Sequence, residues 1–155
     1  MKLTFYTLPS GNDPESESLI EQYQIKISRF VPIQIIKLKP KKIEGSRSEL
    51  KKNHESELIL QKSKEHSQSI LFDEGGKQFS DSIQFSQGLV KQLSSNDLAF
   101  FIGGAFGLTN EHKKEFKTVW SLGSLTMNHH LAAVVALEQL YRGLTIWKNH
   151  PYHNE

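Results

Sequence analysis

The sequence predicts an α/β protein with a mostly parallel sheet and helices on both faces of that sheet. Five short apolar runs alternate with segments of helical periodicity, which is the pattern of parallel strand and helix units. The chain has 155 residues, a length that suits one domain, so we expect a single domain over residues 1–155. Glycine and polar residues follow several of the apolar runs, where an open sheet binds its ligands.

The predicted strands are compact apolar runs bounded by turn or polar residues. They cover residues 2–8, 33–38, 69–72, 98–102 and 124–127. Because a helical segment lies between successive strands, neighbouring strands are expected to run parallel.

The predicted helices follow from capping residues and apolar spacing. Asp13 and Pro14 suit an N-cap and a first helical position, and Leu19, Tyr23 and Ile27 follow at near-helical spacing. The other predicted helices cover residues 46–63, a segment capped by residues 80–81, residues 110–118, and a long final helix over residues 131–147. The final helix carries a broad apolar stripe, which predicts that it packs against the core.

The composition excludes several kinds of site and location. Because the chain has no cysteine, it has no disulfide, no thiolate zinc site and no cysteine nucleophile, which fits a reducing cytoplasm. The N-terminal apolar run is too short for a signal peptide, and no segment approaches the roughly 18 apolar residues of a membrane span. A formal net charge of +2 gives the whole molecule only weak attraction to nucleic acid. We therefore expect a cytoplasmic protein with no membrane partner and no DNA partner.

Positive charge gathers in one segment of the chain. Seven cations lie between Lys37 and Lys52 against two glutamates, and they include Lys41, Lys42 and Arg47. One interpretation is a solvated lysine face, and the other is a patch that contacts phosphate groups. The segment by itself supports both interpretations.

Three loops that follow predicted strands are the candidate ligand-binding segments: residues 73–77, 103–107 and 128–130. The second has the spacing Gly-Gly-x-x-Gly, which differs from the Gly-x-Gly-x-x-Gly of dinucleotide-binding proteins and lacks the lysine and hydroxyl pair of a phosphate-binding loop. It is either a tight turn that needs positive φ or a segment whose backbone groups approach an adenine or a ribose closely.

Several separated motifs stand in one order along the whole chain. They are Phe5 to Leu8, Asp73 with Gly76-Lys77, Gly103-Gly104-x-x-Gly107-Leu108, Ser121-Leu122 through Thr126 and His129, Leu131, Glu138-Gln139-x-Tyr141-Arg142, and Tyr152-His153. In this order and at this length, the chain resembles the small SPOUT-class methyltransferases that act on a pseudouridine of large-subunit ribosomal RNA, the bacterial 23S rRNA pseudouridine N3-methyltransferases.

The resemblance implies a SPOUT-type fold with a C-terminal trefoil knot, a rare exception to unknotted topology, whose knotted cofactor-binding part covers about residues 70–155. It implies S-adenosylmethionine as the cofactor, held bent between the loops that follow the strands. It also implies a homodimer in which the last helix forms much of the interface and each active site lies at the seam between protomers. The implied cofactor contacts are Phe72, Gly103, Gly104, Gly123, Ser124, Leu125, Thr126, Met127 and Asn128.

The terminal residues Tyr152 and His153 are the candidate catalytic pair. Methylation of a ring nitrogen releases an imide proton, and histidine has an unperturbed pKa suited to accept a proton near neutral pH. Three interpretations stay open: His153 is the general base, His153 positions the RNA, or water takes the proton. Tyr152 is suited to stack on an RNA base. We reject a metal site at His150 and His153, because Pro151 breaks any helix there and no carboxylate has a suitable spacing.

Further candidates are residues that would contact RNA. They are Arg142, His129, Lys41, Lys42 and Arg47. Arg142 either binds a phosphate or pairs with Glu138 four residues before it. His129 either caps or packs at the start of the final helix, or it orients the cofactor loop.

The resemblance implies S-adenosylmethionine-dependent methylation of N3 of a pseudouridine in large-subunit (23S) ribosomal RNA, on the assembled ribosome. The alternative is a knotted RNA-binding or ribosome-binding module with weak catalysis. Two positions depart from the family pattern: Asn128 stands where proline is usual, and Ala133 stands where arginine is usual. We expect Asn128 to loosen the cofactor loop and Ala133 to remove a cation that faces RNA or the partner protomer.

Overall fold

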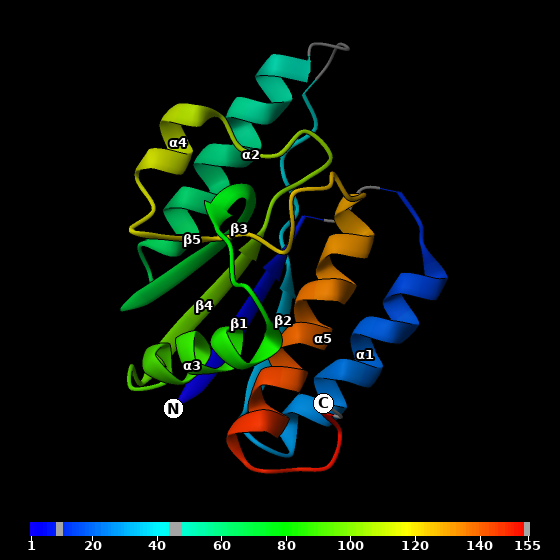
Figure 1. The fold of residues 1–155 in the computed structure, drawn as a ribbon. Helices are drawn as coiled ribbons and strands as arrows, with labels where there is room; N and C mark the ends of the chain where they lie inside the picture. The colour runs from blue at the N-terminus through cyan, green and yellow to red at the C-terminus, as the bar shows by residue number, and fades with distance from the viewer. Residues whose placement is uncertain (9–10, 44–47, 154–155) are drawn as a thin grey trace.

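A computed structural model describes residues 1–8, 11–43 and 48–153, and it contains a five-stranded parallel sheet with the order β2-β1-β4-β3-β5 (Figure 1). The strands are β1 (Lys2–Thr7), β2 (Ile33–Lys37), β3 (Gln68–Lys77), β4 (Asp97–Ile102) and β5 (Thr118–Trp120). The helices are α1 (Pro14–Ser28), α2 (Ser48–Ser63), α3 (Ser82–Gln92), α4 (Asn110–Lys114) and α5 (His129–Trp147). The predicted alternation of strands and helices is confirmed.

Helices cover both faces of the sheet, as predicted. Side chains alternate along a strand, so Phe5 and Phe100 enter one core with α1, α3 and α5, whereas Tyr6 and Phe101 enter a second core with α2. Figure 1 shows α4 on the same side as α2. In the described part of the chain, no helix is long and apolar enough to cross a membrane.

The predicted helix caps are confirmed where they are described. Asp13 caps α1 by accepting a hydrogen bond from the Ser16 backbone N–H at 3.2 Å, and Pro14 is the first helical residue. Asp81 caps α3 in the same way, through the Gln84 N–H at 2.8 Å. The predicted start of the 46–63 helix lies outside the described residues, and the helix is described from Ser48.

The predicted strand at residues 124–127 is wrong. The fifth strand is β5, which pairs with β3 and contains Trp120, a residue only 3% exposed. Leu125, by contrast, is 80% exposed, so the apolar run that predicted a strand is not buried. The predicted helix over residues 110–118 is correspondingly too long, because it ends at Lys114 and Thr118 begins β5.

Residues 73–77, predicted as a loop, continue β3 with an irregular register. Trp120 pairs with both Phe72 and Lys77, so the residues between them form a bulge. Gly76 is at the closest approach: a Cβ there would lie 2.7 Å from the carbonyl carbons of Val119 and Trp120. The Lys77 carbonyl then accepts a hydrogen bond from the Ser121 N–H at 2.8 Å, which positions the segment after β5.

Candidate functional site

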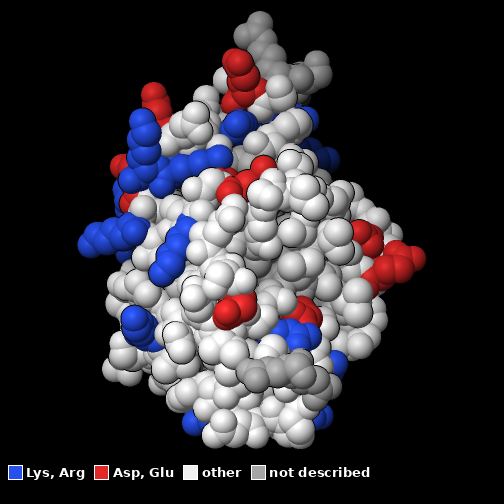
Figure 2. All heavy atoms as spheres, in the orientation of Figure 1, with Lys and Arg blue, Asp and Glu red and all other residues white. Residues whose placement is uncertain are grey.

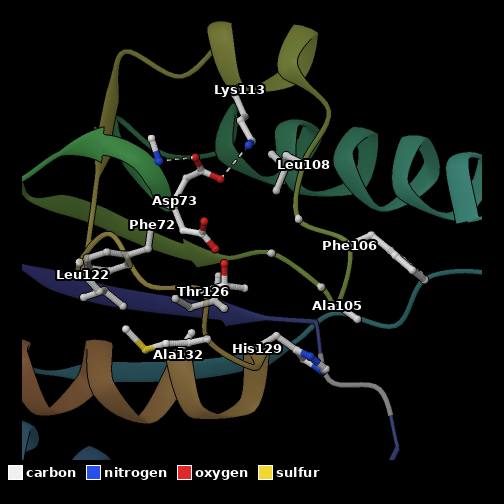
Figure 3. Close-up of a pocket in the computed structure, with 18 of the residues that line it drawn as sticks. Phe72, Asp73, Ala105, Phe106, Leu108, Lys113, Leu122, Thr126, His129 and Ala132 are labelled. Atoms are coloured by element: carbon white, nitrogen blue, oxygen red, sulfur yellow. Dashed lines mark hydrogen bonds and ion pairs between the residues drawn. The ribbon is translucent and has the colours of Figure 1, made fainter.

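One pocket of about 430 Å³ lies beyond the carboxyl ends of β3, β4 and β5 (Figure 3). This volume lies within the range of small-molecule sites. The segment after β4 supplies the glycine loop of residues 103–107, the segment after β5 supplies residues 122–127 except Ser124, and His129 and Ala132 of α5 close one side. Two of the three expected segments, 73–77 and 103–107, therefore meet at one place, whereas the third contribution comes from residues 122–127 after β5, and only His129 of the expected segment 128–130 lines the pocket.

The structure brings most of the predicted cofactor contacts together. Those that line the pocket are Phe72, Gly103, Gly104, Gly123, Leu125, Thr126 and Met127. Ser124 and Asn128 were also predicted to contact the cofactor, but they are not among the lining residues. Asn128 instead caps α5, because its side-chain oxygen accepts a hydrogen bond from the His130 N–H at 2.9 Å.

The two departures from the family pattern have structural consequences at this junction. Asn128 supplies a favourable N-cap, so the position holds the start of α5 rather than leaving it loose. Ala133 is 2% exposed and belongs to the core that α5 shares with α1 and α3. In this chain position 133 is a packing position.

Glu55 of α2 places its carboxylate directly behind Gly104 of the glycine loop. A Cβ on Gly104 would lie 2.5 Å from Glu55 Oε2. That oxygen is buried and has no hydrogen-bond partner among the described residues. Burial raises the pKa of the Glu55 carboxyl above its ordinary value, against the opposing effect of His54 and Lys51. Glu55 therefore supports the loop from behind, and sequence reasoning missed it because no local pattern links α2 to residue 104.

Glu55→Gln is expected to change how stability depends on pH. A carboxyl whose pKa is raised in the folded state contributes stability below its ordinary pKa of 4.5, and this contribution is lost as the pH rises through the raised value. Glutamine removes the charge and keeps the shape. Urea titrations should therefore find the variant more stable than the wild type near pH 7, by less than about 1 kcal/mol because the site is partly solvated, and equal to it near pH 4.

The control for this measurement is Glu57→Gln, an exposed residue on the same helix. Its stability should follow the wild-type pH profile. If Glu55→Gln is destabilised equally at both pH values, the buried carboxylate is not a cost to the folded protein.

An ion pair lies in the pocket wall. Lys113 of α4 places its Nζ 2.9 Å from Asp73 Oδ1, and the other carboxylate oxygen accepts a hydrogen bond from the Gly75 N–H at 2.9 Å (Figure 3). Both charged side chains line the pocket. Lys113 was not singled out from the sequence; its position shortly after the glycine loop was the only signal that pointed to it.

His129 lines the pocket at the first residue of α5. The N-cap is Asn128, so of the interpretations left open for His129, capping is excluded. Burial and the neighbouring His130, whose ring centroid is 4.1 Å away, lower the pKa of His129 below its ordinary value. The imidazole is therefore neutral near pH 7, which makes it a poor ligand for an RNA phosphate.

The terminal pair belongs to a second cluster, which is centred on Glu138 in the middle of α5. Glu138 Oε1 accepts hydrogen bonds from Arg142 Nη2 at 2.6 Å, from Arg142 Nε at 3.1 Å and from the Tyr152 hydroxyl at 3.1 Å. The predicted pairing of Arg142 with Glu138 is confirmed. Arg142 also places its guanidinium 4.8 Å from the Tyr152 ring centre. Glu138 is the residue that organises this cluster.

The geometry of the cluster limits what its members do as acids or bases. Arg142 Nη1 lies 3.4 Å from His153 Nδ1, and because a guanidinium only donates, that nitrogen is the acceptor. His153 in this arrangement presents an N–H, not a lone pair, at Nε2. Burial, with hydrogen bonds to Tyr23 and Glu138, raises the pKa of Tyr152 far above its ordinary value, so its hydroxyl keeps its proton.

The cluster and the pocket are separate within one chain. The pocket is at the first turns of α5, with His129 and Ala132, and the cluster is built on Glu138 and Arg142, nine and thirteen residues after His129, or about 14 and 20 Å along the helix axis. Figure 1 shows the C-terminal end of the chain at the opposite end of α5 from the loops after the strands. Neither Tyr152 nor His153 is among the residues that line the pocket of their own protomer.

The predicted basic segment is only partly described. Lys41 and Lys42 have exposed side chains, and Lys37 is paired with Glu17 of α1. Arg47 lies outside the described residues. Lys and Arg gather at the upper left of Figure 2, over α2 and α4, whereas the surface over α5 in that view is largely uncharged. Within the described ranges, no group of three or more His, Asp or Glu residues is placed to hold a metal ion.

A glycine-lined pocket at the carboxyl ends of a parallel sheet defines this chain as an α/β protein that binds a small cofactor. Comparison with known families narrows the class. A family model described as a predicted SPOUT methyltransferase matches residues 1–153. The chain belongs to the SPOUT methyltransferase family, whose rRNA methyltransferases use S-adenosylmethionine.

Curated relatives match the chain over almost its whole length. A protein of Bdellovibrio bacteriovorus named ribosomal RNA large subunit methyltransferase H is 41% identical over 99% of both chains. Proteins with the same name in Flavobacterium psychrophilum and Syntrophotalea carbinolica are 35% and 37% identical, over 100% and 85% of both chains. A crystal structure of a hypothetical protein superposes with a TM-score of 0.51 at 16% identity, covering 94% of this chain and 68% of the other, which supports the fold alone.

The pocket suits S-adenosylmethionine. Phe72, Leu122 and Met127 supply apolar surface, and the glycine loop leaves its backbone N–H and C=O groups accessible beside them. A Cβ on Gly104 would lie 2.5 Å from Glu55 Oε2, so a side chain at this position would have to displace the end of the Glu55 side chain. These residues would hold the adenosine part of the cofactor.

Proposed function

We propose that this chain transfers a methyl group from S-adenosylmethionine to N3 of a pseudouridine in large-subunit ribosomal RNA. The single observation that carries the proposal is the cofactor-sized pocket at the strand ends of a chain that matches rRNA large subunit methyltransferase H proteins from end to end. The substrate is the assembled ribosome, because a chain of 155 residues offers little surface of its own to select one nucleotide. The reaction takes place in the cytoplasm, and the trefoil knot is part of this proposal.

Methyl transfer depends more on alignment of the reactants and exclusion of water than on a strong acid or base. When bound, S-adenosylmethionine supplies an electrophilic methyl group on a sulfonium. The apolar walls of Phe72, Leu122 and Met127 would hold the sulfonium in a weakly solvating environment, which favours its conversion to a neutral thioether when the methyl group leaves. The strand-end loops fix its direction of approach, which is the larger part of the catalytic effect.

A homodimer completes the active site. Its interface is the surface of α5 and α1, which carries the exposed apolar residues Leu19, Ile25 and Leu131. The charged residues of α5 are only Glu138 and Arg142. Because neither Tyr152 nor His153 lines the pocket of its own protomer, we assign the Tyr152 and His153 of each protomer to the pocket of its partner.

The terminal pair positions the target nucleotide rather than taking its proton. Tyr152 keeps its proton, and Arg142 occupies the Nδ1 lone pair of His153, so water accepts the N3 proton. The Nε2–H of His153 and the Arg142 N–H groups that Glu138 does not use are donors suited to base carbonyl and phosphate oxygens. Lys41, Lys42 and Arg47 extend the RNA contact along the backbone.

Mass spectrometry of ribosomal RNA from cells with and without the protein tests this function. We expect one pseudouridine of the large subunit to lose its methyl group when the protein is absent and to regain it when the wild-type chain is restored. Purified protein should restore the methyl group on isolated ribosomes from the deletion strain. An unchanged set of methylated nucleotides in the deletion strain contradicts the proposal.

A further inference from the structure

The charges that line the pocket are confined to one part of it. Among the lining residues, the formally charged ones are Asp73 and Glu74 at the end of β3 and Lys113 of α4. The rest of the lining is apolar or glycine, with Thr126 and His129 as the polar exceptions. S-adenosylmethionine is divided in the same way, because an uncharged adenosine is joined to a methionine whose head carries an ammonium and a carboxylate.

Asp73 and Lys113 are held in place and are partly shielded from water. The Gly75 N–H holds one oxygen of Asp73 at 2.9 Å, and Lys113 Nζ lies 2.9 Å from the other. The side chains are 18% and 29% exposed. A charge pair at this depth interacts more strongly than one on the open surface, and both of its members still face the pocket.

Both groups have capacity for a second partner. An ammonium has three N–H donors, and among the described contacts Lys113 uses one of them for Asp73. A carboxylate has about four acceptor positions, and Asp73 uses two, for Gly75 and Lys113. A ligand with one ammonium and one carboxylate therefore joins the pair without breaking it.

We propose that the Asp73 and Lys113 ion pair is the subsite for the methionine head of S-adenosylmethionine, with the ligand's ammonium on Asp73 and its carboxylate on Lys113. The four charges then alternate in sign around a ring. This inference deepens the proposed function, since it assigns residues to the cofactor of the family. It also predicts selectivity: a nucleoside without the amino acid head gains nothing from the pair.

Calorimetry with two probes tests the subsite without any enzymatic turnover. S-adenosylhomocysteine carries the amino acid head, and 5′-methylthioadenosine lacks it. The wild type is expected to bind S-adenosylhomocysteine more tightly by about 10-fold or more, since a hydrogen bond to a charged group contributes about 1.5–3 kcal/mol. Asp73→Asn and Lys113→Met should each lower the affinity for S-adenosylhomocysteine by about 10- to 100-fold. The affinity for 5′-methylthioadenosine should stay within about 2-fold of the wild-type value.

Lys114→Met is the matched control, because Lys114 is the next residue of α4, is exposed and does not line the pocket. It should change neither affinity. Equal wild-type affinities for the two probes overturn the proposal without any variant. The proposal is also overturned if Asp73→Asn and Lys113→Met lose affinity for both probes equally, because the pair would then only support α4 against β3. If ribosomal RNA proves not to be the substrate, a retained preference for S-adenosylhomocysteine still supports this subsite.

Discussion

Removal of residues 152–155 is expected to abolish methyl transfer while S-adenosylhomocysteine still binds. Tyr152 and His153 do not line the pocket of their own protomer, so their loss leaves the lining of that pocket unchanged. Misplacing the target nucleotide should lower the rate of methylation by at least about 10²-fold. Single-turnover methylation of ribosomes measures the rate, and calorimetry measures the affinity. A truncated chain with full activity would rule out a substrate-positioning role for the terminal pair.

Mixed dimers show which pocket the terminal pair serves. The truncated chain has an intact pocket, and Gly104→Val, whose side chain meets Glu55, should have an intact terminal cluster but bind no cofactor. Neither homodimer should be active. If the terminal pair acts on the partner's pocket, co-refolded mixtures regain activity, because a heterodimer contains one complete site. Inactive mixtures in which heterodimers are demonstrably present would place the terminal pair and the pocket in the same chain or outside the reaction.

Gly76→Ala is expected to destabilise the folded protein strongly, although it adds only one methyl group. The added Cβ would lie 2.7 Å from backbone carbons of Val119 and Trp120, and backbone cannot rotate away as a side chain does. We expect a loss of about 3 kcal/mol in the free energy of unfolding, measured by urea denaturation. Residues 122–127 follow β5 and contribute to the pocket, so displacement of β5 should also lower the affinity for S-adenosylhomocysteine by more than about 10-fold.

Gly75→Ala is the neighbouring control for the stability measurement. A Cβ at Gly75 would meet only the Asp73 side chain, at 3.3 Å, and that chain is able to adjust. Its cost should stay below about 1 kcal/mol. If the two variants are equally stable, contact between β3 and β5 does not require glycine at position 76.

Hydrogen bonds between residues close in sequence made some elements predictable, whereas elements that depend on distant contacts were not predictable. Asp13 and Asp81 cap helices because a carboxylate bonds N–H groups two or three residues away, and such contacts need no knowledge of the fold. Residues 124–127 were misread because an apolar run predicts burial only when another element covers it, and Leu125 is left exposed. Trp120 forms the strand because β3 and the aromatic core receive it.

The sequence by itself determined the alternating elements, the family and the convergence of residues 73–77 and 103–107 on one cofactor pocket, since these follow from local periodicity, motif order and parallel topology. Only the tertiary structure showed that Glu55 lies behind Gly104, that Lys113 meets Asp73, and that Tyr152 and His153 contact Glu138 and Arg142 rather than line their own pocket. The reason is physical. Contacts between distant segments depend on how whole elements pack, and no local pattern in this chain records that packing.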